Sequence, residues 1–88
     1  MRLFNGFTIR EYGGKTYALA IGEAAKRFNG MLEVNEIGAL ILSELMKNTN
    51  EKEISDAIIQ KYNADRTVVL SDVKNFVGKL RSANLIIE

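Results

Sequence analysis

The sequence predicts one α+β domain, with a three-stranded antiparallel sheet followed by three helices in a winged helix-turn-helix-like arrangement. Short stretches between residues 7 and 34 alternate apolar and polar side chains, as half-buried strands do. Residues 36–82 instead repeat apolar side chains every three or four positions, the period of a buried helix face. A chain of 88 residues has room for one core, so residues 1–88 form a single domain.

The first two strands are expected to form a hairpin. Phe7–Arg10 alternates, and Thr16–Ile21 is a second strand-like run. Between them lies the pair Gly13 and Gly14, which suits a tight hairpin turn. Residues 22–30 are compatible with either a single helical turn or an irregular connector.

The third strand, Met31–Val34, runs directly into the first long helix, with no glycine or proline between them. We expect Leu32 and Val34 to face the core because both are purely apolar. Asn35 is a good N-cap residue, since its side-chain oxygen can accept a hydrogen bond from a backbone N–H of the first turn. The tight connection is therefore expected to hold the outer edge of this strand at the surface.

The three helices are delimited by capping residues and by their apolar repeats. Asn50 and Glu53 resemble a capping box that opens the second helix, and Asp65 caps the third. A strand competes for residues 67–70, but the phase of Val69 favours a helix that ends near Asn84. Residues 85–87 either pack back or add a strand residue or two. The residues expected to face the core are Ile37, Leu40, Ile41, Leu45 and Met46 in the first helix, Ile54, Ala57, Ile58 and Tyr62 in the second, and Val69, Val73, Phe76 and Leu80 in the third.

Composition excludes several function classes. The chain has no cysteine and no histidine, so thiolate chemistry and the commonest general base and metal ligand are absent. It also lacks a Gly-rich phosphate loop, and we expect no catalysis, cofactor or metal. A net charge of +1 provides no global field for nucleic acid. No stretch suits a membrane span or a secretion signal, which predicts a cytoplasmic protein.

Several segments together resemble the PqqD family. The clearest is FNGMLEVNEIGA at residues 28–39, where a strand passes into a helix. Residues 51–54 with Tyr62 are similar to the family's second helix, and residues 72–80 with Leu85 and Ile86 are similar to its third helix and terminal leucine. Where many relatives have a tryptophan in the first helix, this chain has Leu42.

The resemblance implies a non-catalytic recognition element for ribosomally made, modified peptides. Such domains bind the leader segment of a precursor peptide and present it to a modifying enzyme, for example a radical SAM protein, a cyclodehydratase or a lasso-type protease. The leader adds as a strand to the edge of the third strand and lies against the third helix. Strand addition supplies affinity through backbone hydrogen bonds and selectivity through side-chain pockets.

The expected binding surface combines this edge with one flank of the third helix, on which helical spacing places two apolar residues and two cations. The alternative is a plain solvated surface, with its cations favoured by the helix dipole. Gly78 either makes room for a peptide backbone or packs tightly. The candidate peptide-binding residues are Met31, Leu32, Glu33, Val34, Leu70, Lys74, Val77, Gly78 and Arg81.

Three other readings stay open at this point, and one is an accessory subunit that stabilises an enzyme without binding a peptide. A winged-helix DNA-binding regulator would use one helix in the major groove, although no helix combines several Arg or Lys with Asn or Gln on an exposed face. An open strand edge also suits pairing with a second copy, which would give a homodimer that hides the site.

Overall fold

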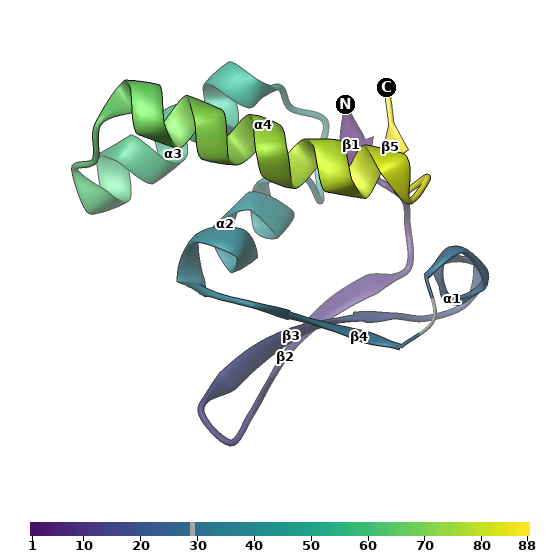
Figure 1. Cartoon of the computed structure of the whole chain (residues 1–88). Helices are drawn as coiled ribbons and strands as arrows, with labels where there is room; N and C mark the ends of the chain where they lie inside the picture. Colours follow the sequence, from purple (N-terminus) through teal and green to yellow (C-terminus); the bar gives the residue numbers. More distant parts are fainter. Residues whose placement is uncertain (29) are drawn as a thin grey trace.

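A computed structural model describes residues 1–28 and 30–88 of the chain. Within these residues it contains five strands and four helices, with the three long helices on one side of the main sheet and the short helix at one end of it (Figure 1). Asn29 lies outside the described residues. In chain order the elements are β1 Arg2–Leu3, β2 Phe7–Tyr12, β3 Lys15–Ala20, α1 Glu23–Arg27, β4 Met31–Val34, α2 Glu36–Glu44, α3 Glu51–Tyr62, α4 Arg66–Ser82 and β5 Ile86–Ile87.

The main sheet is antiparallel and has the strand order β2-β3-β4, as predicted. Gly13 and Gly14, with φ of 57° and 80°, form the turn between β2 and β3, where a two-residue turn of this kind requires positive φ. Ala18 pairs with Ile9 on one side and with Leu32 on the other. This register places the side chains of all three residues on the face of the sheet that packs against the helices.

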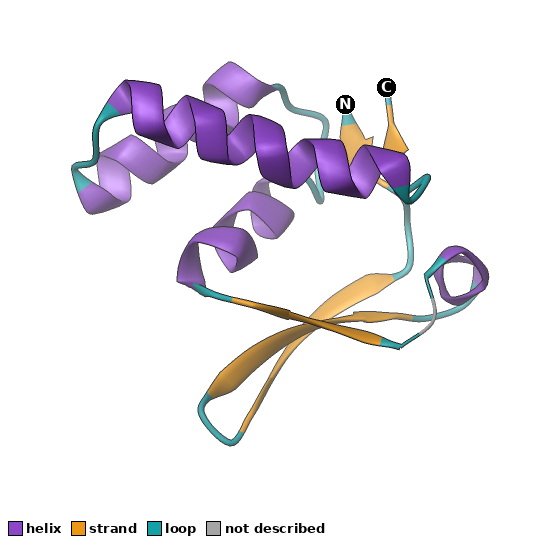
Figure 2. Ribbon diagram, viewed as in Figure 1, coloured by secondary structure: helices purple, strands orange, loops and turns teal. Residues whose placement is uncertain are grey.

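The two ends of the described chain meet in a second, two-stranded sheet. Arg2 in β1 pairs with Ile87 in β5, and Leu3 pairs with Ile86. These strands lie beside the C-terminal end of α4 (Figure 2). The segment of residues 85–87 therefore adds a strand, one of the two outcomes expected for it, whereas β1 was not predicted.

Polar side chains start the three long helices, as predicted. Asn35, Asn50 and Asp65 each accept a hydrogen bond from a backbone N–H of the first turn, at 2.8 Å, donated by Gly38, Glu53 and Thr67, respectively. The capping box is only half formed, because Glu53 Oε2 accepts a bond from Thr49 Oγ1, 3.1 Å away. Asn63 ends α3 in the left-handed conformation, with φ of 51°.

Helices α2, α3 and α4 pack together over the inner face of the sheet. The structure corrects one residue of the predicted α2 face: Met46 follows the helix and is 48% exposed, while Leu42, which was not assigned to that face, is buried. The short helix α1 fills the segment left open in the sequence, with Ala24 fully buried. Across the described residues, the helices are too short or too polar to span a bilayer. The buried hydrophobic core consists of Leu3, Ala18, Ala24, Val34, Ile41, Leu42, Leu45, Ile54, Ile58, Val69, Val73, Val77, Leu80 and Leu85.

Candidate functional site: a groove between β4 and α4

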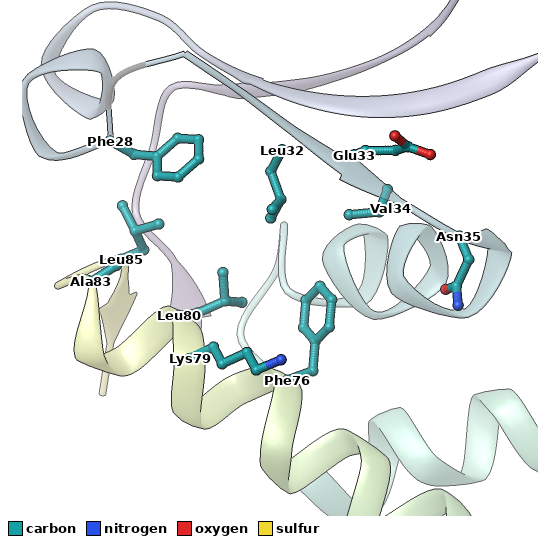
Figure 3. Close-up of a pocket in the computed structure, with 10 residues that line it drawn as sticks. All are labelled: Phe28, Leu32, Glu33, Val34, Asn35, Phe76, Lys79, Leu80, Ala83 and Leu85. Atoms are coloured by element: carbon teal, nitrogen blue, oxygen red, sulfur yellow. The ribbon is translucent and has the colours of Figure 1, made fainter.

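A groove of about 370 Å³ separates strand β4 from helix α4 (Figure 3). One wall comes from β4, the other comes from the C-terminal half of α4, and residues before β4 and after α4 close one end. Its lining is mostly apolar: Phe28, Leu32, Glu33, Val34, Asn35, Phe76, Lys79, Leu80, Ala83 and Leu85. A concave apolar surface with a few polar groups at its rim is the usual form of a ligand site.

The β4 wall follows from strand alternation. Leu32 and Val34 extend from the strand toward α4, whereas Glu33 points away from the groove (Figure 3). Val34 is buried as predicted, but Leu32 is half-buried because its side chain lies along the open groove. Met31 is 56% exposed on the other face of the sheet. Glu33 Oε2 lies 3.9 Å from Lys15 Nζ on the neighbouring strand, a weak exposed pair.

The outer edge of β4 carries unpaired backbone groups. In the described part of the chain β4 is hydrogen-bonded to β3 alone, so its other edge has no strand partner. Such an edge is a template for another extended segment, and proteins usually block it with a lysine, a proline or a covering loop. The sequence of β4, Met31-Leu32-Glu33-Val34, contains neither lysine nor proline. An extended peptide placed here would border the groove.

The α4 wall is built from Phe76 and Leu80, with the amino group of Lys79 reaching along it (Figure 3). The ring of Phe76 lies close to the start of α2 because residue 38 is a glycine. A Cβ on Gly38 would lie 3.1 Å from Phe76 Cε2 and 3.2 Å from Val34 Cβ. Gly38 therefore allows the strand, α2 and the Phe76 ring to meet at one end of the groove.

The structure corrects the predicted orientation of α4. Val77 was expected on an accessible flank, but it has no exposed surface and belongs to the core. Phe76, expected in the core stripe, is half-buried and lines the groove. Val69, Val73, Val77 and Leu80 also satisfy a helical repeat, so the buried stripe lies slightly to one side of the predicted one.

The other residues predicted on α4 lie outside the groove lining. Leu70 is half-buried near the start of the helix, and Lys74 is exposed. Gly78 lies with Lys74 and Lys79 in a shallow depression on the outer face, where a Cβ would meet no atom within 4 Å. Tight packing therefore does not explain Gly78. Whether Leu70, Lys74 or Gly78 contacts a ligand remains a prediction.

Arg81 is occupied by an ion pair on a different side of α4. Its Nε donates to Glu88 Oε2 over 2.8 Å, and its Nη2 lies 3.8 Å from Met1 Sδ. The hydrogen bond to Glu88 raises the pKa of Arg81 and lowers the pKa of Glu88. This arrangement links α4 to the terminal strands, away from the groove. Lys79, which was not among the predicted binding residues, is instead the cation that lines the groove.

The closed end of the groove was not foreseen. Phe28 precedes β4, Ala83 and Leu85 follow α4, and all three line it. The ring of Phe28 also packs on Phe7, with ring centroids 6.4 Å apart. Phe28 begins the segment that resembles the PqqD family, but the sequence analysis did not assign it to the binding surface. Nothing resembling a metal centre accompanies the groove, since no cluster of three or more Asp or Glu residues occurs among residues 1–28 and 30–88.

Comparisons with known proteins agree with this architecture. The family described as "Coenzyme PQQ synthesis protein D (PqqD)" matches residues 16–86, which include both groove walls. The chain belongs to the PqqD family. No curated protein sequence matches it. A solved structure, "TbiB1 in Complex with the TbiA(beta) Leader Peptide", has the same fold, with a TM-score of 0.71 and 22% sequence identity. The match covers 97% of this chain and 93% of TbiB1.

Proposed function

We propose that this PqqD-family chain is a non-catalytic binding module for the leader segment of a ribosomally synthesised precursor peptide. The leader adds as a strand to the outer edge of β4 and places alternate side chains in the groove against α4. The observation that carries the proposal is the unpaired β4 edge beside an apolar groove. Main-chain hydrogen bonds at such an edge supply affinity, and the pockets beside it supply selectivity.

The comparisons support this class of ligand. The matched family and a protein of the same fold solved with a leader peptide both point to peptide recognition. The DNA-binding reading gains no comparable support, because two of the four α4 cations are already paired, Arg66 with Asp56 and Arg81 with Glu88. The expected winged helix-turn-helix-like arrangement therefore gives no support to a DNA-binding function.

The groove favours a leader segment with apolar and acidic side chains. The lining residues Leu32, Phe76 and Leu80 suit an apolar side chain directed into the groove. Lys79 lies at its rim, and none of the described residues forms an ion pair with it or with Lys74. We therefore place an acidic leader residue against Lys79 in place of the contact expected for Arg81.

The module then presents the bound leader to a modifying enzyme in the cytoplasm. A radical SAM protein, a cyclodehydratase and a lasso-type protease are the candidate partners. Binding of the leader along β4 leaves the remainder of a precursor free to extend toward such an enzyme. Pairing of β4 with a second copy of the chain would compete with the leader, because both use the same edge.

The test uses a fluorescein-labelled synthetic leader from a candidate precursor peptide, chosen from short reading frames near the gene of this chain. Fluorescence polarisation measures its dissociation constant (Kd) for the chain and for two matched variants on β4. Leu32→Ser removes an apolar side chain from the groove, while Met31→Ser changes the exposed neighbour on the other face of the sheet. We expect Leu32→Ser to weaken binding about tenfold or more, as for loss of a buried apolar contact, and Met31→Ser to change it little.

Two results would contradict the proposal. Absence of binding to the chain at high micromolar concentration would exclude this leader as its ligand. Equal losses for the two variants would place the ligand outside the groove.

A further inference from the structure

Arg27, the last residue of α1, connects the two sides of the groove at its closed end. Its Nη1 donates a hydrogen bond to the main-chain oxygen of Asn84, 2.8 Å away and 57 residues further along the chain. Its guanidinium carbon lies 3.9 Å from the centroid of the Phe4 ring. One side chain thus ties α1, which precedes β4, to the segment that follows α4. Figure 1 shows α1 at the same end of the molecule as the C-terminal end of α4.

Backbone hydrogen bonds fix the positions of the two groups that contact the guanidinium, the Phe4 ring and the Asn84 oxygen. The Phe4 N–H donates to the Leu85 oxygen over 2.7 Å, which holds the ring beside the segment that carries the acceptor. The Asn84 N–H donates to the Arg81 oxygen over 3.0 Å, and Asn84 has the left-handed φ of 61° that turns the chain after α4. The acceptor oxygen and the aromatic face are therefore positioned together.

Each partner in this contact is next in sequence to a residue that lines the groove. Arg27 precedes Phe28, and Asn84 precedes Leu85. The hydrogen bond between Arg27 and Asn84 therefore joins the residues next to Phe28 and Leu85. Other contacts around α1 reach the segment that enters β2: Ala24 is buried near Gly6, and Phe28, which follows α1, packs on Phe7.

The other end of the groove needs no such link. There β4 continues directly into α2 through Asn35, and Gly38 lets the Phe76 ring approach both elements. The covalent chain and close packing fix the distance between the walls at that end. At the Phe28–Leu85 end, the Arg27 contact provides a side-chain link between the walls, beside the backbone bonds of Phe4 and Gly6.

We propose that Arg27 is a positioning residue that holds the Phe28–Leu85 end of the groove at the width needed by the ligand. This inference rests on the proposed function and deepens it. It assigns specificity for the ligand's apolar side chain at this end to a residue that does not line the groove. Loss of the guanidinium lets α1 move away from Leu85. Part of the binding free energy is then spent on closing this end of the groove when the peptide binds.

The test compares Arg27→Met, Arg27→Lys and Lys26→Met in the full chain. Arg27→Met keeps the apolar stem and removes the hydrogen bond and the cation. Lys26→Met is the matched control because it removes the same charge one residue earlier, where Lys26 pairs with Glu23 of its own helix. Arg27→Lys keeps a cation that can still bond the carbonyl and lie over Phe4.

Two readouts separate this inference from the proposed function. The first is amide exchange at Phe28, whose N–H donates to the Ala24 oxygen at the end of α1. In the free protein we expect exchange at Phe28 to become severalfold faster in Arg27→Met and to stay unchanged in Lys26→Met. The second is the Kd for the labelled leader, which we expect to rise about tenfold in Arg27→Met and to recover largely in Arg27→Lys.

The results of these experiments distinguish failure of the proposed leader-binding function from failure of the Arg27 inference. If the unmodified chain does not bind the leader, the proposed function fails for that peptide. The rate of amide exchange at Phe28 then tests the contact between Arg27 and Asn84 independently of binding. Unchanged exchange in Arg27→Met overturns the link itself. A Kd that rises equally in Arg27→Met and Lys26→Met overturns the positioning role, because charge alone would then explain the loss.

Discussion

Phe76 and Val77, adjacent residues of α4, occupy two different environments. Val77 has no exposed surface and packs in the core, while Phe76 lines the groove and lies against the start of α2. The boundary between the core and the candidate site therefore passes between two neighbouring side chains. Substitutions at the two positions should separate stability from binding.

We expect Val77→Ala to lower the free energy of unfolding by about 2 kcal/mol, because it leaves a cavity in the core. Val77→Asp would bury an unpaired carboxylate and unfold the domain. Urea unfolding followed by circular dichroism measures both effects. A fully folded Val77→Asp variant would contradict the burial of this side chain.

Gly38, which lies against Phe76, and Gly78, which follows Phe76 in α4, provide a matched pair of substitutions. A Cβ at Gly78 meets no atom within 4 Å, so Gly78→Ala should raise the free energy of unfolding by about 0.5–1 kcal/mol. Gly38→Ala should raise the free energy of unfolding by less than this, or lower it, because the new Cβ would crowd Phe76 and Val34. Thermal unfolding of both variants gives the comparison. Greater stability of Gly38→Ala than of Gly78→Ala would disagree with the packing at Phe76.

Lys79 is expected to contribute an electrostatic contact to an acidic leader. Lys79→Gln should weaken binding about threefold to tenfold, as for one partly exposed charge-assisted bond, and the loss should shrink as salt is added. Lys47→Gln, an equal charge change at an exposed position outside the groove lining, serves as the control. Polarisation titrations at low and high salt test both. Identical losses in the two variants would indicate a nonspecific charge effect.

The pairing of α3 with the start of α4 should make stability depend on pH. Hydrogen bonds from Arg66 and then Lys52 hold the pKa of Asp56 below its ordinary value. Stabilisation by a carboxylate with a lowered folded pKa is complete above its unfolded pKa, about 3.9, and disappears as the pH falls through the folded value. Asp56→Asn should therefore lower the melting temperature at about pH 7 and have little effect at about pH 2. An equal difference at both pH values would contradict this.

Local signals made much of the fold predictable. Asn35, Asn50 and Asp65 marked three helix starts, because a capping side chain acts within its own first turn. The Gly13-Gly14 turn identified the hairpin for the same reason. Strand β1 was missed, since a two-residue strand depends on a partner more than 80 residues away, and so short a segment has no periodicity of its own.

The site was predictable only on its β4 side. Strand alternation separates Leu32 and Val34 from Met31 and Glu33, so the groove side of the strand follows once the core side is known. The α4 side needed long-range information. Repeats through Phe76 or through Val77 both satisfy helical spacing, and the position of β4 and α3 around the helix decides between them. Arg27 was overlooked because its partner Asn84 is distant in sequence.

The most direct test of the central claim is detection of a ligand strand on β4. Isotope-filtered NMR on the labelled chain with unlabelled leader peptide would record nuclear Overhauser effects between α-protons of the peptide and those of Met31–Val34. We predict a cross-strand pattern along this segment, together with contacts to the ring of Phe76 and the methyl groups of Leu80. A bound peptide that gives no contact to the β4 backbone, or that contacts α4 only at Leu70, Lys74 and Arg81, would contradict the claim.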